Sequence, residues 1–224
     1  MGMRQHQWNI ASQDNIKRRP QPMSPRRFVM RIDLMGIRPP IWRRIEASSD
    51  LTLDTFHVVI QKAFAWHDCH LHEFSRVDTN RKHTIERFLM PYMLADGEEG
   101  IPEENGRLGD VLKNPKDMLM YQYDFGDDWE HRICLEEIRD GNLDLPKAIC
   151  TAGKRAAPPE DCGGSWGYRM MVGAGSDPTH PDHEETAERI CWLLGEDAKL
   201  NPERFDLDGV NRMLVDLTPS EHYW

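Results

Sequence analysis

The sequence has no apolar run near the roughly 20 residues that span a bilayer, so no membrane segment is predicted. Its first 20 residues carry charges with no apolar stretch after them, and we expect no secretory signal. Cysteine is scarce: there are 5, an odd number, and no two form a C-x-x-C pair. Reduced thiols are therefore favoured over a disulfide framework, and we expect a cytoplasmic protein.

Several motifs that define enzyme classes are also missing. The chain has no G-x-x-x-x-G-K-[ST] phosphate loop, no G-x-S-x-G elbow and no G-x-G-x-x-G after a predicted strand. Serine hydrolases and dinucleotide oxidoreductases therefore have little support. The zinc patterns C-x-x-C and H-E-x-x-H are absent too, which weakens the case for a metal without excluding one.

Positive charge is concentrated at the start of the chain. Residues 1–44 hold ten Lys or Arg and two acids, a net +8, which leaves −18 for residues 45–224 within the total of −10. The acidic remainder repels nucleic-acid phosphates, but a basic arm could contact them. A solvated tail is the alternative interpretation. The candidate nucleic-acid contacts are Lys17, Arg18, Arg19, Arg26 and Arg27.

Hydrophobic periodicity predicts an α+β protein with a mainly antiparallel sheet. Alternating residues predict strands over 28–35, 41–46, 71–77, 118–124 and 129–136. An amphipathic helix capped by Thr52 ends before Trp66 and should pack on the sheet. Residues 95–106 and the Gly/Pro-rich 139–181 are expected to be loops, the second long and ordered, with helices after it. The expected organisation is a flexible basic arm (1–26), one domain (27–180) and C-terminal helices packed on that domain (181–224).

Potential metal ligands are concentrated between Trp66 and His72. On a strand His70 and His72 would face the same side, spaced for two ligands of one ion such as zinc. Further ligands would come from Asp124, Asp127 or His131. Structural histidines that hydrogen-bond their neighbours are the alternative.

A second polar block surrounds the turn between the two strands that end at residue 124 and begin at residue 129. Gly126 should permit the turn, and Phe125 and Trp129 should fill the core. His131 shares the face of Trp129, so we expect it to be buried and paired with an aspartate of the turn. The structural interpretation is favoured here over a catalytic one.

A third block, residues 150–168, combines Gly163 and Gly164, which let the backbone approach a ligand or another segment, with two acids. If the blocks meet, they form one candidate pocket. Its residues are His70, His72, Asp124, Asp127, Trp129, His131, Glu160, Asp161, Gly163, Gly164 and Tyr168.

Five ordered motifs carry a resemblance to a known family. They are PPIWRRIE (39–46), TLDTFHVVIQKAFAW (52–66), HLHEF (70–74), YDFGDDWEH (123–131) and APPEDCGGSWGY (157–168). The chain resembles the plasmid pRiA4b ORF-3-like family. The resemblance implies an α+β fold and passenger proteins of plasmids and insertion elements, some labelled TnpR, with no established reaction. No serine-recombinase motif or helix-turn-helix supports that label here.

Three functional hypotheses follow. The favoured one is an accessory or binding module of a mobile element that contacts DNA through the basic arm or contacts a protein of the element. The second is a metal-dependent hydrolase or nuclease with a His/Asp site. In the third, the motifs only determine the fold. The sequence leaves open whether the protein is an enzyme and how it oligomerises.

If the basic arm binds DNA, removal of residues 1–26 should weaken binding and reduce its dependence on salt, because fewer counterions are released. Gel shifts of both proteins over a series of salt concentrations test this. No retardation of DNA by the full chain at low salt would contradict DNA binding.

Overall fold

The computed structural model describes residues 26–78, 83–141, 145–195 and 199–218. Within these residues eight strands form one sheet in the order β5-β4-β3-β6-β7-β1-β2-β8. Every pair is antiparallel except β4 with β5, which confirms the predicted sheet type. The strands are β1 (Arg27–Leu34), β2 (Ile41–Ser48), β3 (His72–Asp78), β4 (His83–Leu89), β5 (Ile101–Pro102), β6 (Met118–Tyr123), β7 (Trp129–Arg139) and β8 (Ala148–Lys154).

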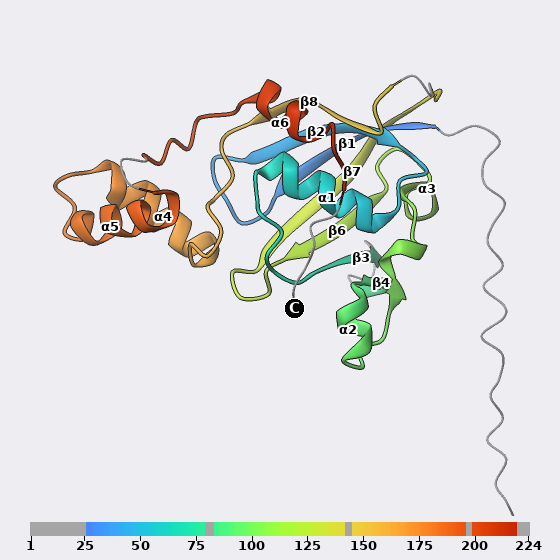
Figure 1. Cartoon of the computed structure of the whole chain (residues 1–224), viewed down its shortest axis with the longest axis horizontal. Coiled ribbons are helices and arrows are strands. Elements are labelled where there is room, and N and C mark those ends of the chain that lie inside the picture. Colours follow the sequence, from blue (N-terminus) through green and yellow to red (C-terminus); the bar gives the residue numbers. More distant parts are fainter. Residues whose placement is uncertain (1–25, 79–82, 142–144, 196–198, 219–224) are drawn as a thin grey trace, which may run out of the picture.

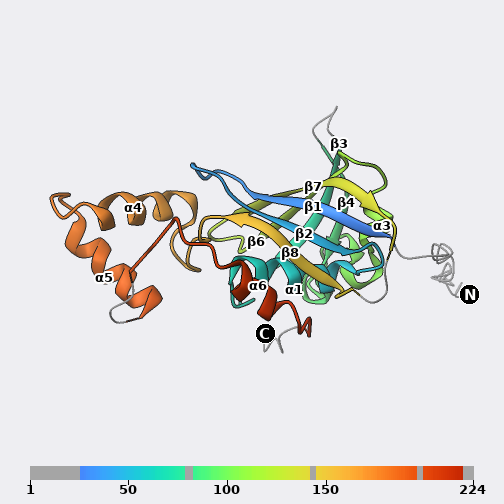
Figure 2. The same cartoon turned by 90° about the horizontal axis from the view of Figure 1, so that it is seen from above.

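Helix α1 crosses one face of this sheet, and α6 packs against α1 and β8 (Figure 1). Helices α4 and α5 pack on each other and lie to one side of the sheet (Figure 2). No helix in the described ranges has the length and apolar character of a membrane span. The helices are α1 (Leu53–Phe64), α2 (Pro91–Ala95), the 3-10 turn η1 (Glu103–Asn105), α3 (Leu108–Val111), α4 (Gly164–Ser176), α5 (His183–Leu194) and α6 (Leu207–Met213).

Helix α1 begins and ends where its sequence pattern predicts. Thr52 occupies the N-cap position, and the helix ends at Phe64, before Ala65 turns into the left-handed region with φ 58°. Phe56, Ile60 and Phe64 recur at helical spacing and are buried against the sheet. The end of α1 therefore directs the following loop to the edge of the core.

The alternation in β2 places one charged residue beneath α1. Arg43 is only 3% exposed, and its guanidinium donates to the carbonyls of Ala63, Trp42 and Lys154. Burial lowers the pKa of Arg43 to about 10, so it remains charged at neutral pH. It satisfies a carbonyl at the end of α1 and lies over the ring of Phe64.

The predicted long loop over 139–181 is wrong, because this segment contains β8 and all of α4. β8 exists through pairing with β2, which periodicity does not reveal. Four glycines in α4 lower its helix propensity, so the local sequence does not predict the helix. At Gly167 the glycine is required by packing, because a Cβ there would lie 1.9 Å from the carbonyl oxygen of Cys162. The loop predicted over 95–106 likewise contains β5 and η1.

Arg27 does not belong to an exposed arm, which corrects the expectation for this residue. It begins β1, is 4% exposed and donates to the carbonyl oxygen of Pro146 at 2.6 Å. Arg26 is exposed. The other proposed nucleic-acid contacts, Lys17, Arg18 and Arg19, lie outside the described residues.

The start of α4 gives a test of close packing. Gly164 has φ +63°, and a Cβ there would lie 2.4 Å from the carbonyl oxygen of Asp127. We expect Gly164→Ala to destabilise the protein by roughly 1–3 kcal/mol. In the same helix Gly173 has open space around it, so Gly173→Ala should stabilise by up to about 1 kcal/mol. Equal melting temperatures for the two variants would contradict this packing.

Candidate functional site

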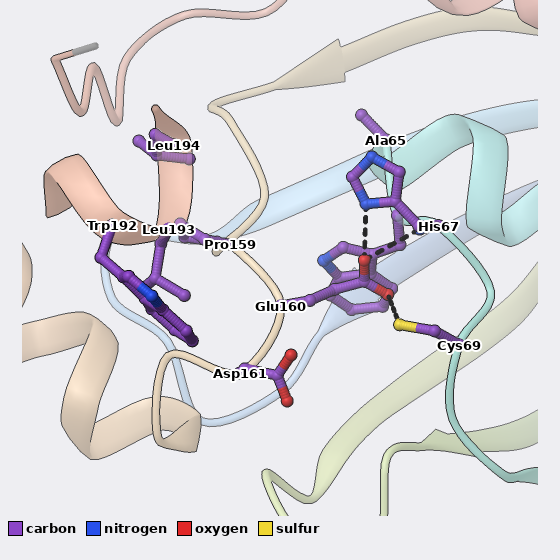
Figure 3. A pocket seen from close by; sticks show the side chains of 10 residues that line it. Ala65, His67, Cys69, Pro159, Glu160, Asp161, Trp192, Leu193 and Leu194 are labelled. Atoms are coloured by element: carbon purple, nitrogen blue, oxygen red, sulfur yellow. Dashed lines mark hydrogen bonds and ion pairs between the residues drawn. The ribbon is translucent and has the colours of Figure 1, made fainter. Parts of the chain in front are cut away.

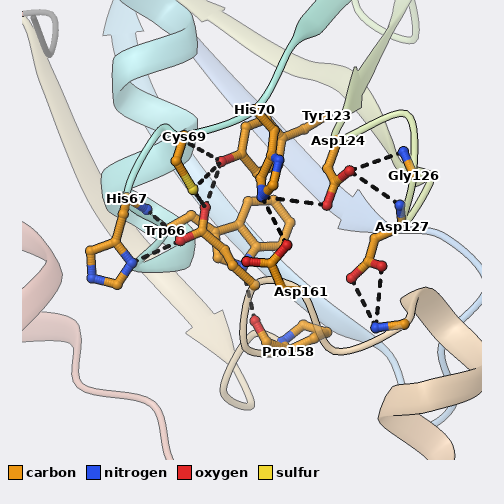
Figure 4. Close-up of polar contacts among 12 residues, drawn as sticks. Trp66, His67, Cys69, His70, Tyr123, Asp124, Gly126, Asp127, Pro158 and Asp161 are labelled. Atoms are coloured by element: carbon orange, nitrogen blue, oxygen red, sulfur yellow. Dashed lines mark hydrogen bonds and ion pairs between the residues drawn. The ribbon is translucent and has the colours of Figure 1, made fainter. Parts of the chain in front are cut away.

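Three chain segments meet beside the end of α1, and we call this region the loop junction. They are the loop after α1 (65–71), the β6–β7 turn (124–128) and the segment that leads into α4 (155–163) (Figure 4). Each contains an aspartate with left-handed backbone: Asp68 at φ 59°, Asp124 at 56° and Asp161 at 57°. Aspartate is one of the few residues besides glycine that adopt this conformation, and residues held in it cluster at turns and functional sites.

Trp66 joins the first segment to the third. Its indole N–H donates to the carbonyl oxygen of Pro158 at 2.9 Å, and its ring stacks on Tyr123 with centroids 5.1 Å apart. Trp66 is nearly buried, so this hydrogen bond is shielded from water.

Glu160 receives donors from the loop after α1 and from the end of β6. Its carboxylate accepts from the backbone N–H and Nδ1 of His67, at 3.0 and 2.7 Å, and from the hydroxyl of Tyr123 at 2.5 Å. Burial and the adjacent carboxylate raise the pKa of Tyr123 well above its usual range, so it stays a donor. Burial, then Glu160, raises the pKa of the Cys69 thiol to about 11, which keeps it protonated at neutral pH.

His70 faces two carboxylates from different segments, and we call this set the open centre. Its Nε2 lies 3.4 Å from Oδ1 of Asp161 and 3.6 Å from Oδ2 of Asp124. The other oxygen of Asp124 accepts from the backbone N–H groups of Gly126 and Asp127. This holds the Asp124 carboxylate so that one oxygen remains directed at His70 (Figure 4).

An open pocket of about 410 Å³ adjoins this centre (Figure 3). Trp192 and Leu193 of α5 form one side, and the loop junction forms the other. The Trp192 side chain is 78% exposed, so a large aromatic surface is available beside the carboxylate of Asp161. The pocket is lined by Ala65, Trp66, His67, Cys69, Pro159, Glu160, Asp161, Trp192, Leu193 and Leu194.

Three groups of side chains in the described residues could hold a metal ion. Two share His70 at the loop junction, with Asp124 and Asp161 or with Cys69 and Glu160. The third is buried and separate, and consists of His57, Asp68 and His72. We call it the buried centre.

His70 and His72 do not act on one ion as predicted. His70 precedes β3 and faces the loop junction. His72 is the first residue of β3 and is 1% exposed, and its Nε2 lies 2.8 Å from Oε2 of Glu103. The prediction that both side chains face the same side of a strand is wrong, because only His72 lies on the strand.

His131 is buried as predicted, but its partner is different. Its Nδ1 lies 3.2 Å from the carbonyl oxygen of Trp129, and its neighbours are the rings of Phe64, Trp66 and Tyr121. Asp124 and Asp127, the partners expected for His131, instead accept from the backbone N–H groups of Gly126 and Gly163. His131 is therefore a core residue rather than a metal ligand.

Several other predicted pocket residues have structural positions. Asp127 accepts from the backbone N–H of Gly163 at 3.1 Å and so joins the β6–β7 turn to the start of α4. Gly164 packs on the backbone of Asp127. Trp129 and Tyr168 are 1% and 2% exposed core residues outside the pocket lining.

Two expectations for the β6–β7 turn are also wrong. The positive φ angles are at Asp124 and Asp128, not at Gly126. Phe125 is 41% exposed rather than part of the core. Aspartate tolerates the left-handed region through local hydrogen bonds, which explains why Asp124 and Asp128 rather than Gly126 have the positive φ angles of this turn.

Sequence reasoning missed His57, Glu103 and Trp192. His57 interrupts the apolar face of α1 between Phe56 and Ile60, and a polar residue at such a position is a usable signal of a buried partner. Glu103 lay within an expected loop. For Trp192 no local pattern indicates the pocket, because only the placement of α5 creates it.

The fold and the loop junction define a class: an α+β protein with a long antiparallel sheet and an acidic, aromatic pocket at the end of its first helix. More specifically, the chain belongs to the plasmid pRiA4b ORF-3-like protein family, whose pattern matches residues 26–209. This confirms the resemblance seen in the sequence motifs.

Two relatives support the assignment. The uncharacterized protein y4hQ of Sinorhizobium fredii (strain NBRC 101917 / NGR234) is 32% identical over 164 residues, which cover 71% of this chain and 78% of y4hQ. A crystal structure of MM3350, a protein of unknown function from Methanosarcina mazei Go1, is similar with a TM-score of 0.69 at 34% identity. The match covers 83% of this chain and 97% of that one. These relatives have no established reaction.

His131 predicts a pH dependence of stability. Burial lowers its pKa from 6.5 to about 3, so the folded chain keeps the ring neutral while the unfolded chain takes up a proton near pH 6.5. The stabilisation is complete above pH 6.5 and is lost as the pH falls toward 3. In urea unfolding, His131→Leu should reduce the stability lost between pH 7 and pH 4 by on the order of 3 kcal/mol. His180→Ala, on the surface, should leave that loss unchanged, and equal losses for all three proteins would contradict the assignment.

Proposed function

We propose that this protein is a binding protein of a mobile element whose open centre takes a divalent cation, with His70, Asp124 and Asp161 as ligands. An imidazole nitrogen with two carboxylate oxygens is a donor set that zinc accepts. The three ligands come from the three segments of the loop junction, so the ion would join parts of the chain far apart in sequence.

The separation of the ligand atoms carries this proposal. His70 Nε2 makes no hydrogen bond, although it lies 3.4 and 3.6 Å from carboxylate oxygens of Asp161 and Asp124. Two ligands bonded to zinc at about 2.1 Å in tetrahedral geometry lie about 3.4 Å apart. The atoms are therefore too far apart for good hydrogen bonds but well spaced for a shared ion.

The centre supports binding of an outside ligand. The Asp161 side chain is 59% exposed and lines the pocket, so an ion held here would be reached from solvent and from the pocket on the Asp161 side. Three protein ligands with one open position are typical of zinc sites that bind water or another molecule.

The arrangement of Glu160 supports the hydrolase alternative less well than a binding role. A metal-dependent hydrolase needs a group that accepts a proton from the bound water. One Glu160 oxygen accepts from Tyr123 and the other from His67, so this carboxylate is already engaged. This arrangement favours a binding role.

The partner and the compartment belong to the same proposal. A protein of the mobile element is the partner that the acidic surface favours, since the body outside residues 1–44 repels nucleic acid. DNA remains the partner proposed for the basic arm. All five cysteines are free thiols, which supports the reducing cytoplasm.

Zinc titration of the chelator-treated protein tests the open centre. We expect His70→Ala and Asp161→Asn each to lower the affinity for the zinc ion that EDTA removes rapidly by at least about tenfold. The loss of only an outer hydrogen-bond partner of a ligand already has an effect of this size. His180→Ala is the matched control, because its ring also lies near an aspartate, Asp182, on the surface. Equal zinc affinity in all variants, or no zinc bound by the unmodified chain, would refute the proposal.

A further inference from the structure

The buried centre lies in the core beneath α1. Nε2 of His57 lies 2.6 Å from Oδ1 of Asp68, and its Nδ1 lies 2.8 Å from the hydroxyl of Tyr121. His57, Asp68 and His72 are 3%, 6% and 1% exposed. One ligand atom from each of these three residues lies within 4.8 Å of the other two.

His72 has one nitrogen engaged and one without a partner. Its Nε2 lies 2.8 Å from Glu103, which as a carboxylate can only accept, so Nε2 carries the proton. Its Nδ1 is buried and makes no hydrogen bond. In the neutral ring that nitrogen offers a lone pair, whose burial without a partner is costly.

Electrostatics also favours a cation. Asp68 and Glu103 bring two carboxylates into the core, at 6% and 5% exposure. Two imidazolium rings could neutralise them, but the rings of His57 and His72 are stacked 3.5 Å apart and 6° from parallel, where like charges repel. One divalent ion neutralises both carboxylates while both rings stay neutral.

From these observations we infer a second divalent-cation site, formed by His57, Asp68 and His72 and independent of the open centre. Glu103 accepts from His72 as the outer carboxylate that commonly orients a ligating histidine. Tyr121 occupies the equivalent position on Nδ1 of His57. The ion replaces the proton that His57 shares with Asp68, so loading releases protons.

Coordination changes the ring geometry. A ligated ion lies close to the plane of each imidazole ring, and two parallel planes 3.5 Å apart cannot share one ion. Binding of an ion at this centre would therefore require one of the two rings to turn out of the stack. Because the site is enclosed, exchange of the ion requires local opening of the core and is slow.

Metal counting by native mass spectrometry tests this inference with zinc, and cobalt(II) absorption tests it without any substitution. We expect two ions per chain, of which EDTA removes one rapidly and one slowly. Asp68→Asn and His72→Gln should each lose the slow ion and keep the fast one. His70→Ala with Asp161→Asn should lose only the fast ion.

The outcomes separate the two sites. A single ion that EDTA removes rapidly and that His70→Ala abolishes would overturn the buried site and leave the open centre intact. A single ion that EDTA removes slowly and that Asp68→Asn abolishes would support the buried site and overturn the open centre. If the core variants fail to fold, the unmodified chain still decides: a cobalt(II) complex with no slowly removed fraction overturns the inference.

Discussion

The carboxylate of Glu160 is the contact on which the loop junction depends. It is nearly buried and accepts from His67 in the loop after α1 and from Tyr123 at the end of β6. A buried carboxylate without donors would be strongly unfavourable, so these contacts fix the relative positions of three segments. The pocket and the open centre exist because this junction is fixed, with Trp66 and Pro158 providing the second connection.

The loop after α1 contributes one residue to each of the two candidate metal centres. Asp68 turns inward to His57, and His70, two residues later, faces the carboxylates at the surface. The left-handed backbone at Asp68 accompanies this change of direction. One short segment therefore contributes a ligand residue to each of the two centres.

Much of the fold follows from local patterns. Alternation predicted β1, β2, β6 and β7, because each has one face against the core. Helix α1 followed from its apolar spacing, and Thr52 occupies the N-cap position although its side chain makes no capping hydrogen bond. Helix α4 did not, since its glycines are selected by contacts with Cys162 and Asp127 that are absent from the local sequence. For the site, the polar blocks identified His70, Asp124, Glu160 and Asp161, but they also included His72 and His131, which are core residues.

The sequence by itself determined the family, the α+β class and the set of polar blocks, because motifs and periodicity are local properties of the chain. Only the tertiary structure decided which polar side chains meet. His70 and His72 are separated by one residue yet belong to different centres. β3 begins at His72 and places that side chain in the core beside Glu103, whereas His70 lies in the preceding loop and faces Asp161. Such a division depends on burial and on partners supplied from distant segments, and neither is encoded in spacing along the chain.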